Sequence, residues 1–307
     1  MKVLVTGASG MVGRNITEHQ GFFGYDMYTP SSSELDLLSM ESVRDYLKSI
    51  QPEIIIHCAG KVGGIQANIQ APLEYLVTNI DMGRNLVLAA HETGVPKLLN
   101  LGSSCMYSNN HDEAIPESSL LSGPLEPTNE GYALAKIVVA KLCEYINRKE
   151  QFQYKTAIPC NVYGRYDNFN PSSSHFLAAI ILKLQHAMEN SLETVEIWGS
   201  GDARRELIFA QDLADFVFYA CCNFNNMPEL INVGTGYDHS INEYYAMAAE
   251  VLGYQGKFTH DKTRDEGMRR KLTDISKLNK FGWKARTELR AGIAETVDFY
   301  REHVDNG

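Results

Sequence analysis

A glycine-rich turn joins a short apolar run to a helical pattern close to the start of the chain. Residues 3–6 predict a buried strand and residues 11–19 predict a helix. Small residues between them let the backbone approach a pyrophosphate, and the N–H groups and dipole of the helix attract the anion. The turn could also be a tight connection without a ligand, but its place in a strand–helix–strand unit favours nucleotide binding. The predicted dinucleotide contacts are Gly7, Ser9, Gly10, Met11, Val12 and Gly13.

The alternation of strand and helix patterns continues through the first half of the chain. Further buried strands are predicted near Tyr28 and at residues 53–58, 97–101 and 155–162, and helices at 40–49, 78–93 and 132–149. Apolar runs without polar alternation are typical of strands covered on both faces, so we predict an α/β fold with a Rossmann-type, doubly wound parallel sheet.

The second half has a different pattern. It predicts a loop at 168–175, helices at 176–189, 242–252 and 289–302, a strand at 194–198, and a strand at 230–233 that rejoins the main sheet. We predict that residues 1–163 and 206–234 form an NADP-binding Rossmann domain. Residues 164–205 and 235–307 would form a smaller C-terminal lobe that binds a nucleotide sugar.

Composition excludes several classes of protein. The chain has 307 residues and a formal net charge of -10, which disfavours nucleic acid as a partner. No basic segment followed by a long apolar one indicates a secretory signal, and no apolar run approaches the ~20 residues that span a bilayer. The six cysteines lack the paired spacing of a zinc site. We therefore expect a cytoplasmic protein with reduced thiols, no metal and no membrane partner.

The residues after the second strand bear on the cofactor. A carboxylate there binds the ribose of NAD, whereas an arginine suits the 2′-phosphate of NADP. Thr29-Pro30-Ser31-Ser32-Ser33 offers neither. Because hydroxyls can donate to a phosphate, we predict NADPH, with NADH as the alternative. Arg14 is either a further cofactor contact or a solvated helix residue.

Tyr132 and Lys136 are four residues apart, which places both on one face of a helix. A tyrosine is a weak acid near pH 7, and a neighbouring ammonium is expected to lower its pKa. Such a pair is common on solvated helices. Here the third strand ends at Gly102-Ser103-Ser104, where ligands bind in doubly wound sheets, so a serine hydroxyl could reach the same carbonyl oxygen.

The order and spacing of the glycine turn, the serine and the Tyr-Lys pair resemble the short-chain dehydrogenases. Asn161-Val162-Tyr163-Gly164 resembles their extended branch, which acts on nucleotide sugars. A closer resemblance is to GDP-L-fucose synthases, which are GDP-4-keto-6-deoxymannose 3,5-epimerase/4-reductases. It is carried by Lys61-Val62-Gly63-Gly64-Ile65, Leu101-Gly102-Ser103-Ser104-Cys105, Glu126-Pro127-Thr128-Asn129-Glu130, Asp167-Asn168-Phe169 and Ser174-His175.

This resemblance implies a role for each matching residue. Ser103, Tyr132 and Lys136 would serve hydride transfer, and Cys105 and His175 would exchange protons at C3 and C5 of the sugar. Tyr132, Lys136 and His175 would also contact the cofactor. Asn161, Trp198, Arg205 and Lys271 would bind the GDP-sugar, with Arg204, Arg269 and Arg270 as alternative cations. The resemblance also implies a homodimer formed by the helix of Tyr132 and the helix before it. Without the family resemblance, Cys105 would be interpreted as a small buried residue, and His175 as a residue that donates a hydrogen bond to a loop carbonyl.

Two departures keep alternatives open. Ser9 stands where the family usually has an arginine that recognises the 2′-phosphate, and residues 261–267 are more polar than the corresponding family loop. A related GDP-4-keto-deoxy sugar, from a heptose or colitose pathway, is therefore the alternative substrate. A non-catalytic NAD(P)-sensing protein is a further alternative, against which the intact Tyr132, Lys136, Cys105 and His175 argue.

Overall fold

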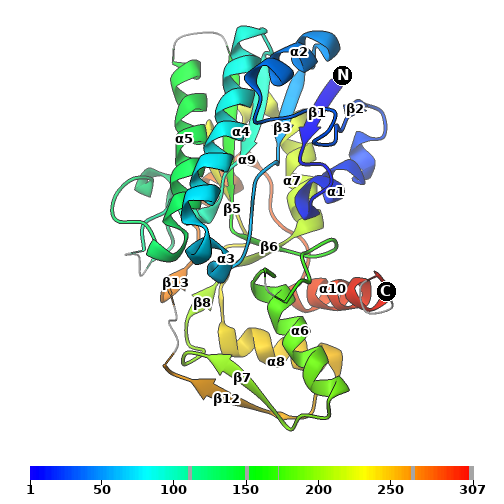
Figure 1. Ribbon diagram of the computed structural model, residues 1–307, viewed down its shortest axis with the longest axis vertical. Helices are drawn as coiled ribbons and strands as arrows, with labels where there is room; N and C mark the ends of the chain where they lie inside the picture. Colours follow the sequence, from blue (N-terminus) through cyan, green and yellow to red (C-terminus); the bar gives the residue numbers. More distant parts are fainter. Residues whose placement is uncertain (110–112, 149–151, 172, 264–266, 304–307) are drawn as a thin grey trace.

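A six-stranded parallel sheet forms the centre of the larger part of the molecule (Figure 1). The computed structural model describes residues 1–109, 113–148, 152–171, 173–263 and 267–303. The strands run in the order β10-β5-β4-β3-β1-β2. They are β1 (Lys2–Thr6), β2 (Asp26–Tyr28), β3 (Ile54–His57), β4 (Lys97–Leu101), β5 (Gln153–Pro159) and β10 (Leu230–Val233). The order reverses between β1 and β3, where such sheets bind ligands at their carboxyl edge. The predicted Rossmann-type fold is confirmed.

Helices cover both faces of this sheet (Figure 1). One face carries α2 (Met40–Ile50), α4 (Pro72–Glu92) and α5 (Glu130–Asn147), which contribute Leu47, Leu86 and Val139 to its core. The other face carries α1 (Met11–Thr17), α7 (Ala210–Cys222) and α9 (Ser276–Phe281), and Leu213 and Leu278 lie in that core.

A smaller lobe lies beyond the carboxyl edge of the sheet, in the lower part of Figure 1. Its core contains Leu184, Tyr244 and Val297. The lobe consists of α6 (Phe176–Glu189), α8 (Ile241–Leu252), α10 (Leu289–His303) and the paired strands β7 (Thr194–Trp198) and β12 (Lys257–Asp261). A small sheet of β11 (His239–Ser240), β8 (Arg204–Arg205) and β13 (Arg270–Lys271) adjoins it. No helix in the described ranges is long and apolar enough to cross a membrane.

The predicted strand at 155–162 is present, but it is divided into two strands. β5 ends at Pro159, and β6 (Asn161–Tyr163) leaves the main sheet to pair with β9 (Leu207–Phe209). β5 is largely buried and β6 is only partly buried, and a single polar residue, Asn161, lies between the apolar residues of the two strands. The bend places Asn161 at the carboxyl edge of the sheet.

Several helix boundaries also differ from the prediction. The helix predicted at 78–93 begins at Pro72, a residue suited to the first helical turn. The helix predicted at 11–19 ends at Thr17, and a 3-10 turn (Gln20–Phe22) follows it. The predicted end at residue 149 lies outside the described residues. α3 (Ile65–Gln70) and α9 were not predicted.

Candidate active site

A cavity of about 1690 Å³ lies between the carboxyl edge of the sheet and the smaller lobe. It brings together residues that are far apart in the sequence. Its lining includes Gly7, Ser9, Gly10, Met11, Val12, Gly13, Ser103, Cys105, Tyr132, Lys136, Asn161, His175, Trp198, Arg205 and Lys271. Arg14 is not part of this lining, and its guanidinium carbon lies 4.9 Å from the centre of the Tyr166 ring.

Two glycines of the turn, Gly7 and Gly13, are packed too tightly to be replaced by a residue with a side chain. Gly7 has a φ of +73°, and a Cβ there would lie 2.6 Å from the Cα of Ala59. A Cβ on Gly13 would lie 2.2 Å from the Gly7 carbonyl oxygen. The backbone itself therefore forms this wall of the cavity, which fits the cradle that a dinucleotide pyrophosphate needs.

The wall next to β2 contains three serines. They are Ser9, Ser31 and Ser32. The N–H and the hydroxyl of Ser31 both donate to Glu34, at 2.8 Å each. The Ser31 hydroxyl is thus already engaged, and of the three serines only Ser9 and Ser32 remain as candidate donors to a cofactor phosphate.

Tyr132 and Lys136 both reach the cavity from α5. The ammonium of Lys136 lies 5.8 Å from the centre of the Tyr132 ring and donates to the Leu101 carbonyl at 3.0 Å. Burial lowers the pKa of Lys136 to about 8. Burial and the nearby Cys105 thiol raise the pKa of Tyr132, against the opposing effect of a hydrogen bond with Ser103. The expected lowering of the Tyr132 pKa is therefore wrong for this arrangement, because desolvation dominates.

Cys105 lies beside Ser103 at the end of β4, in a short 3-10 turn (Ser104–Met106). The Ser103 hydroxyl accepts the Cys105 N–H at 3.3 Å. The thiol sulfur accepts hydrogen bonds from Lys271 Nζ at 3.3 Å and from Asn129 Nδ2 at 3.4 Å. Burial alone would raise the pKa of Cys105, but the charge of Lys271, the hydrogen bonds of Ser103 and Lys271, and the charge of Arg205 together lower it.

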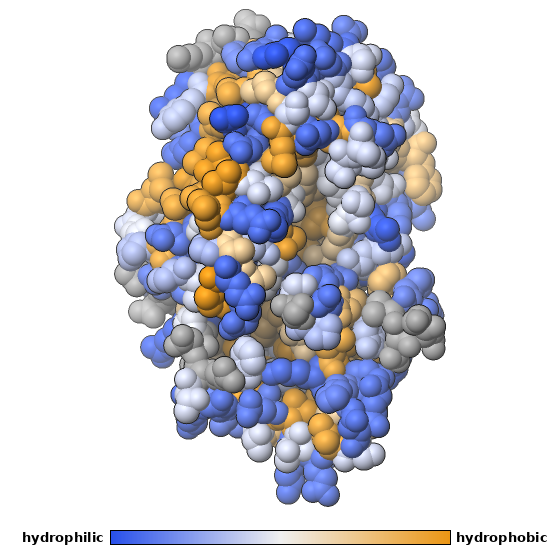
Figure 2. Space-filling view, in the orientation of Figure 1, coloured by the Kyte–Doolittle hydropathy of each residue, from blue (hydrophilic) through white to orange (hydrophobic). Residues whose placement is uncertain are grey.

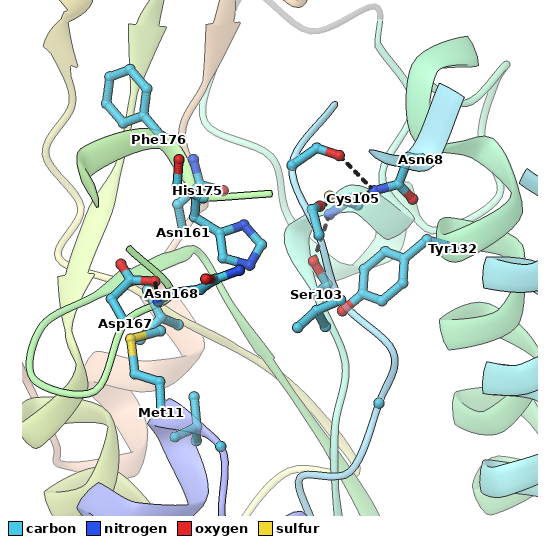
Figure 3. Close-up of a pocket in the computed structure, with 18 of the residues that line it drawn as sticks. Met11, Asn68, Ser103, Cys105, Tyr132, Asn161, Asp167, Asn168, His175 and Phe176 are labelled. Carbon is cyan, nitrogen blue, oxygen red and sulfur yellow. Dashed lines mark hydrogen bonds between the residues drawn. The ribbon is translucent and has the colours of Figure 1, made fainter. Parts of the chain in front are cut away.

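His175 lies across the cavity from Cys105, at the N-cap position of α6. Figure 3 shows its imidazole on the wall formed with Asn161, Asp167 and Asn168, facing the wall that carries Ser103, Cys105 and Tyr132. Burial lowers the pKa of His175. The two predicted proton-exchanging residues therefore stand on opposite sides of the same space.

The remaining predicted residues surround the lobe end of the cavity. Trp198 is 43% exposed, and Lys183 Nζ lies 4.7 Å from the centre of a Trp198 ring. The Arg205 guanidinium donates to the carbonyls of Met268 (2.6 Å) and Arg204 (2.8 Å). Lys183 was not predicted, because a single lysine on an amphipathic helix carries no sequence signal.

The alternative cations have other surroundings. The guanidinium groups of Arg204 and Arg270 both donate to Asp238, and Arg269 is exposed. None of the three lines the cavity.

Asp167 and Asn129 also line the cavity, and neither was given a role from the sequence. Burial raises the pKa of Asp167 to about 7. Among the described residues, no hydrogen-bond partner contacts its Oδ2. The described part of the chain contains no group of three His, Cys, Asp or Glu side chains that could hold a metal ion.

Comparison with known proteins gives consistent matches. The model of the NAD dependent epimerase/dehydratase family matches residues 3–234. The chain is 53% identical to a GDP-L-colitose synthase of Yersinia pseudotuberculosis, over 100% of both chains. It is 44% identical to a GDP-L-fucose synthase of Azorhizobium caulinodans, over 97% of this chain and 96% of that one. The sequence-based resemblance to GDP-L-fucose synthases is confirmed.

A solved structure supports the same relationship. The GDP-mannoheptose C4 reductase MlghC of Campylobacter jejuni, with NADP bound, superposes with a TM-score of 0.87 at 29% identity, covering 98% of each chain. The family and this relative indicate a nicotinamide cofactor, as predicted. On these matches, the chain belongs to the NAD dependent epimerase/dehydratase family.

Proposed function

We propose that the chain catalyses NADPH-dependent epimerisation and 4-reduction of a GDP-4-keto-6-deoxyhexose. One observation carries this proposal: a reducing group (Ser103, Tyr132 and Lys136) and a proton-exchanging pair (Cys105 and His175) line the same cavity as the glycine turn.

Reduction of the 4-keto group requires a proton at the oxygen and a hydride at the carbon. The nicotinamide cofactor, when bound along the glycine turn, supplies the hydride. Tyr132 supplies the proton, and its raised pKa keeps the phenol protonated and able to donate. Ser103 provides a second hydroxyl at the same oxygen. Lys136, held by the Leu101 carbonyl, lies beside the phenol. Its ammonium stabilises the negative charge of the phenolate that remains after Tyr132 has donated its proton.

Epimerisation uses the acidity of the carbons beside the ketone. Loss of a proton from C3 or C5 gives an enolate, whose oxygen Tyr132 and Ser103 stabilise by hydrogen bonds. Cys105, with its lowered pKa, is suited to remove the proton. His175 on the facing wall is placed to return a proton to the other face. Inversion needs groups on both faces of the sugar, because a single group that removed and returned the proton on one face would restore the original configuration at that carbon.

The GDP moiety would bind at the lobe end of the cavity. Arg205 and Lys183 bring positive charge there, as a diphosphate requires. Trp198 offers a half-exposed aromatic surface for the base or ribose, and Asn161 lies at the bend between β5 and β6.

Two sugars are candidate substrates. The first is GDP-4-keto-6-deoxy-D-mannose, which would give GDP-L-fucose. The second is its 3-deoxy analogue, which would give GDP-L-colitose, and the higher identity to a colitose synthase, 53% against 44%, favours it. Colitose has no hydroxyl at C3, so only C5 would be inverted.

Turnover in D2O with NADPH separates these possibilities. GDP-L-fucose deuterated at C3 and C5 would support the first substrate, and efficient turnover of the 3-deoxy analogue with deuterium retained at C5 would support the second. Reduction without solvent deuterium would identify a pure reductase. Failure to reduce either sugar would refute the proposal.

We also propose a homodimer. Apolar side chains are exposed along α3, α4 and α5, at Ile69, Leu73, Val77, Leu134 and Val138. Figure 2 shows apolar surface gathered over this side of the molecule. Pairing of α4 and α5 with their copies would bury it in a four-helix interface. Sedimentation of the wild type as a monomer would contradict this proposal.

A further inference from the structure

The ammonium of Lys271 lies against the thiol of Cys105 in the wall of the cavity. Lys271 Nζ is 3.3 Å from the sulfur, and the lysine side chain is buried. Lys271 lies on β13, which pairs in parallel with β8, so its backbone is held by a sheet rather than by a loop.

Asn129 brings a second donor to the same sulfur. Its Nδ2 lies 3.4 Å from Cys105 Sγ, and it occupies the N-cap position of α5, the helix that carries Tyr132. Two N–H donors aimed at one sulfur suit a thiolate better than a thiol, because a thiolate is an acceptor only.

We propose that Lys271 and Asn129 form a thiolate cradle, which holds Cys105 as the base of the epimerisation before substrate arrives. Both are positioning residues, since they act through Cys105. The inference rests on the proposed function. In the step itself, the thiolate takes the proton from the carbon beside the ketone, an S–H bond forms, and the C–H electrons pass into the enolate.

The other ionisable groups around the sulfur are compatible with this role. Arg205 adds a second positive charge, and its own guanidinium lies near the Glu126 carboxylate. Tyr132 is the other acidic group beside the thiol, and its raised pKa keeps it neutral. His175 faces the sulfur from the opposite wall.

The cradle is tested without substrate by the rate at which iodoacetamide alkylates Cys105 at different pH values. Peptide mass spectrometry separates Cys105 from the other thiols. Cys58 is an internal control, because it lines the same cavity and burial raises its pKa to about 12. We expect the wild-type midpoint for Cys105 to lie below that of an ordinary cysteine. Lys271→Met should raise the alkylation midpoint of Cys105. It should also slow alkylation at pH 7 by about tenfold, which is the change that one pKa unit produces.

Matched variants keep the result interpretable. Lys271→Arg should restore much of the reactivity of Cys105. Asn129→Leu should also raise the alkylation midpoint, but by less than Lys271→Met. This second variant tests the cradle even where Lys271→Met fails to fold. Arg269→Met removes an exposed cation two residues away and should leave the midpoint unchanged. An unchanged midpoint in both Lys271→Met and Asn129→Leu would overturn the cradle.

A second readout tests its link to the proposed function. The pH profile of solvent deuterium exchange into the sugar should shift upward in Lys271→Met, in parallel with alkylation. A shift in alkylation without one in exchange would leave the cradle intact and refute Cys105 as the epimerisation base.

Discussion

Lys136 is a buried cation, and its replacement by methionine should change how stability depends on pH. Burial lowers its pKa from the ordinary 10.5 to about 8. One pKa unit corresponds to about 1.36 kcal/mol, so keeping this ammonium charged in the fold costs about 3 kcal/mol at pH 7.

The direction of the pH effect follows from the two proton affinities. Between pH 8 and 10.5 the unfolded chain holds the proton more firmly than the folded chain. Stability is therefore regained as pH rises through this window, and at pH 9 the cost has fallen to about 2 kcal/mol. Methionine has a similar unbranched shape and no charge, so Lys136→Met removes the whole effect.

The assay is urea unfolding of wild type and variant at pH 7 and pH 9. The Leu101 carbonyl loses its donor in the variant, which costs about 1 kcal/mol or more at both pH values. The diagnostic quantity is therefore the free energy of unfolding of the variant minus that of wild type, which should be about 1 kcal/mol lower at pH 9 than at pH 7.

Lys141→Met is the matched control. Lys141 lies on the same helix, is partly exposed and pairs with Glu144 at 2.7 Å. Its difference from wild type should be the same at both pH values. A Lys136→Met difference that stays constant, or grows, between pH 7 and pH 9 would refute the assignment of a buried charge.

Four further substitutions test the remaining parts of the site. Ser9→Arg should raise the ratio of kcat/KM for NADPH to that for NADH by about tenfold, because the arginine adds one charge-assisted contact to the 2′-phosphate. Gly13→Ala should weaken NADPH binding, measured by cofactor fluorescence, by at least about tenfold, because its Cβ would lie 2.2 Å from a backbone oxygen. His175→Gln should reduce epimerised product by about 10²-fold or more while cofactor binding persists. Val138→Glu should give a monomer in sedimentation experiments, because it places a charge in the proposed interface.

The sheet and its reducing group could be predicted from the sequence because their signals are local. The strand patterns of β1, β4 and β10 and the spacing of Tyr132 and Lys136 depend on residues that are neighbours in the chain. The division into β5 and β6 could not be predicted, because a single polar residue, Asn161, is compatible with one continuous strand, and only the pairing of β6 with β9 separates the two.

The surroundings of the side chains depend on packing between distant segments. Lys271 carries a charge that suits a diphosphate, and only the pairing of β13 with β8 reveals that its ammonium lies on the Cys105 sulfur. The predicted lowering of the Tyr132 pKa is wrong for a related reason. The sequence shows the nearby lysine but not the burial that outweighs it.

Catalysis of the 4-reduction by Tyr132 is the central claim, and Tyr132→Phe tests it most directly. The variant loses one hydroxyl and keeps the ring, so NADPH should bind as it does to wild type. Stopped-flow measurement of NADPH oxidation with the 4-keto sugar should show a rate about 10²- to 10⁴-fold lower, which is the usual contribution of a general acid. Oxidation at the wild-type rate would show that another group protonates the oxygen and would contradict the account.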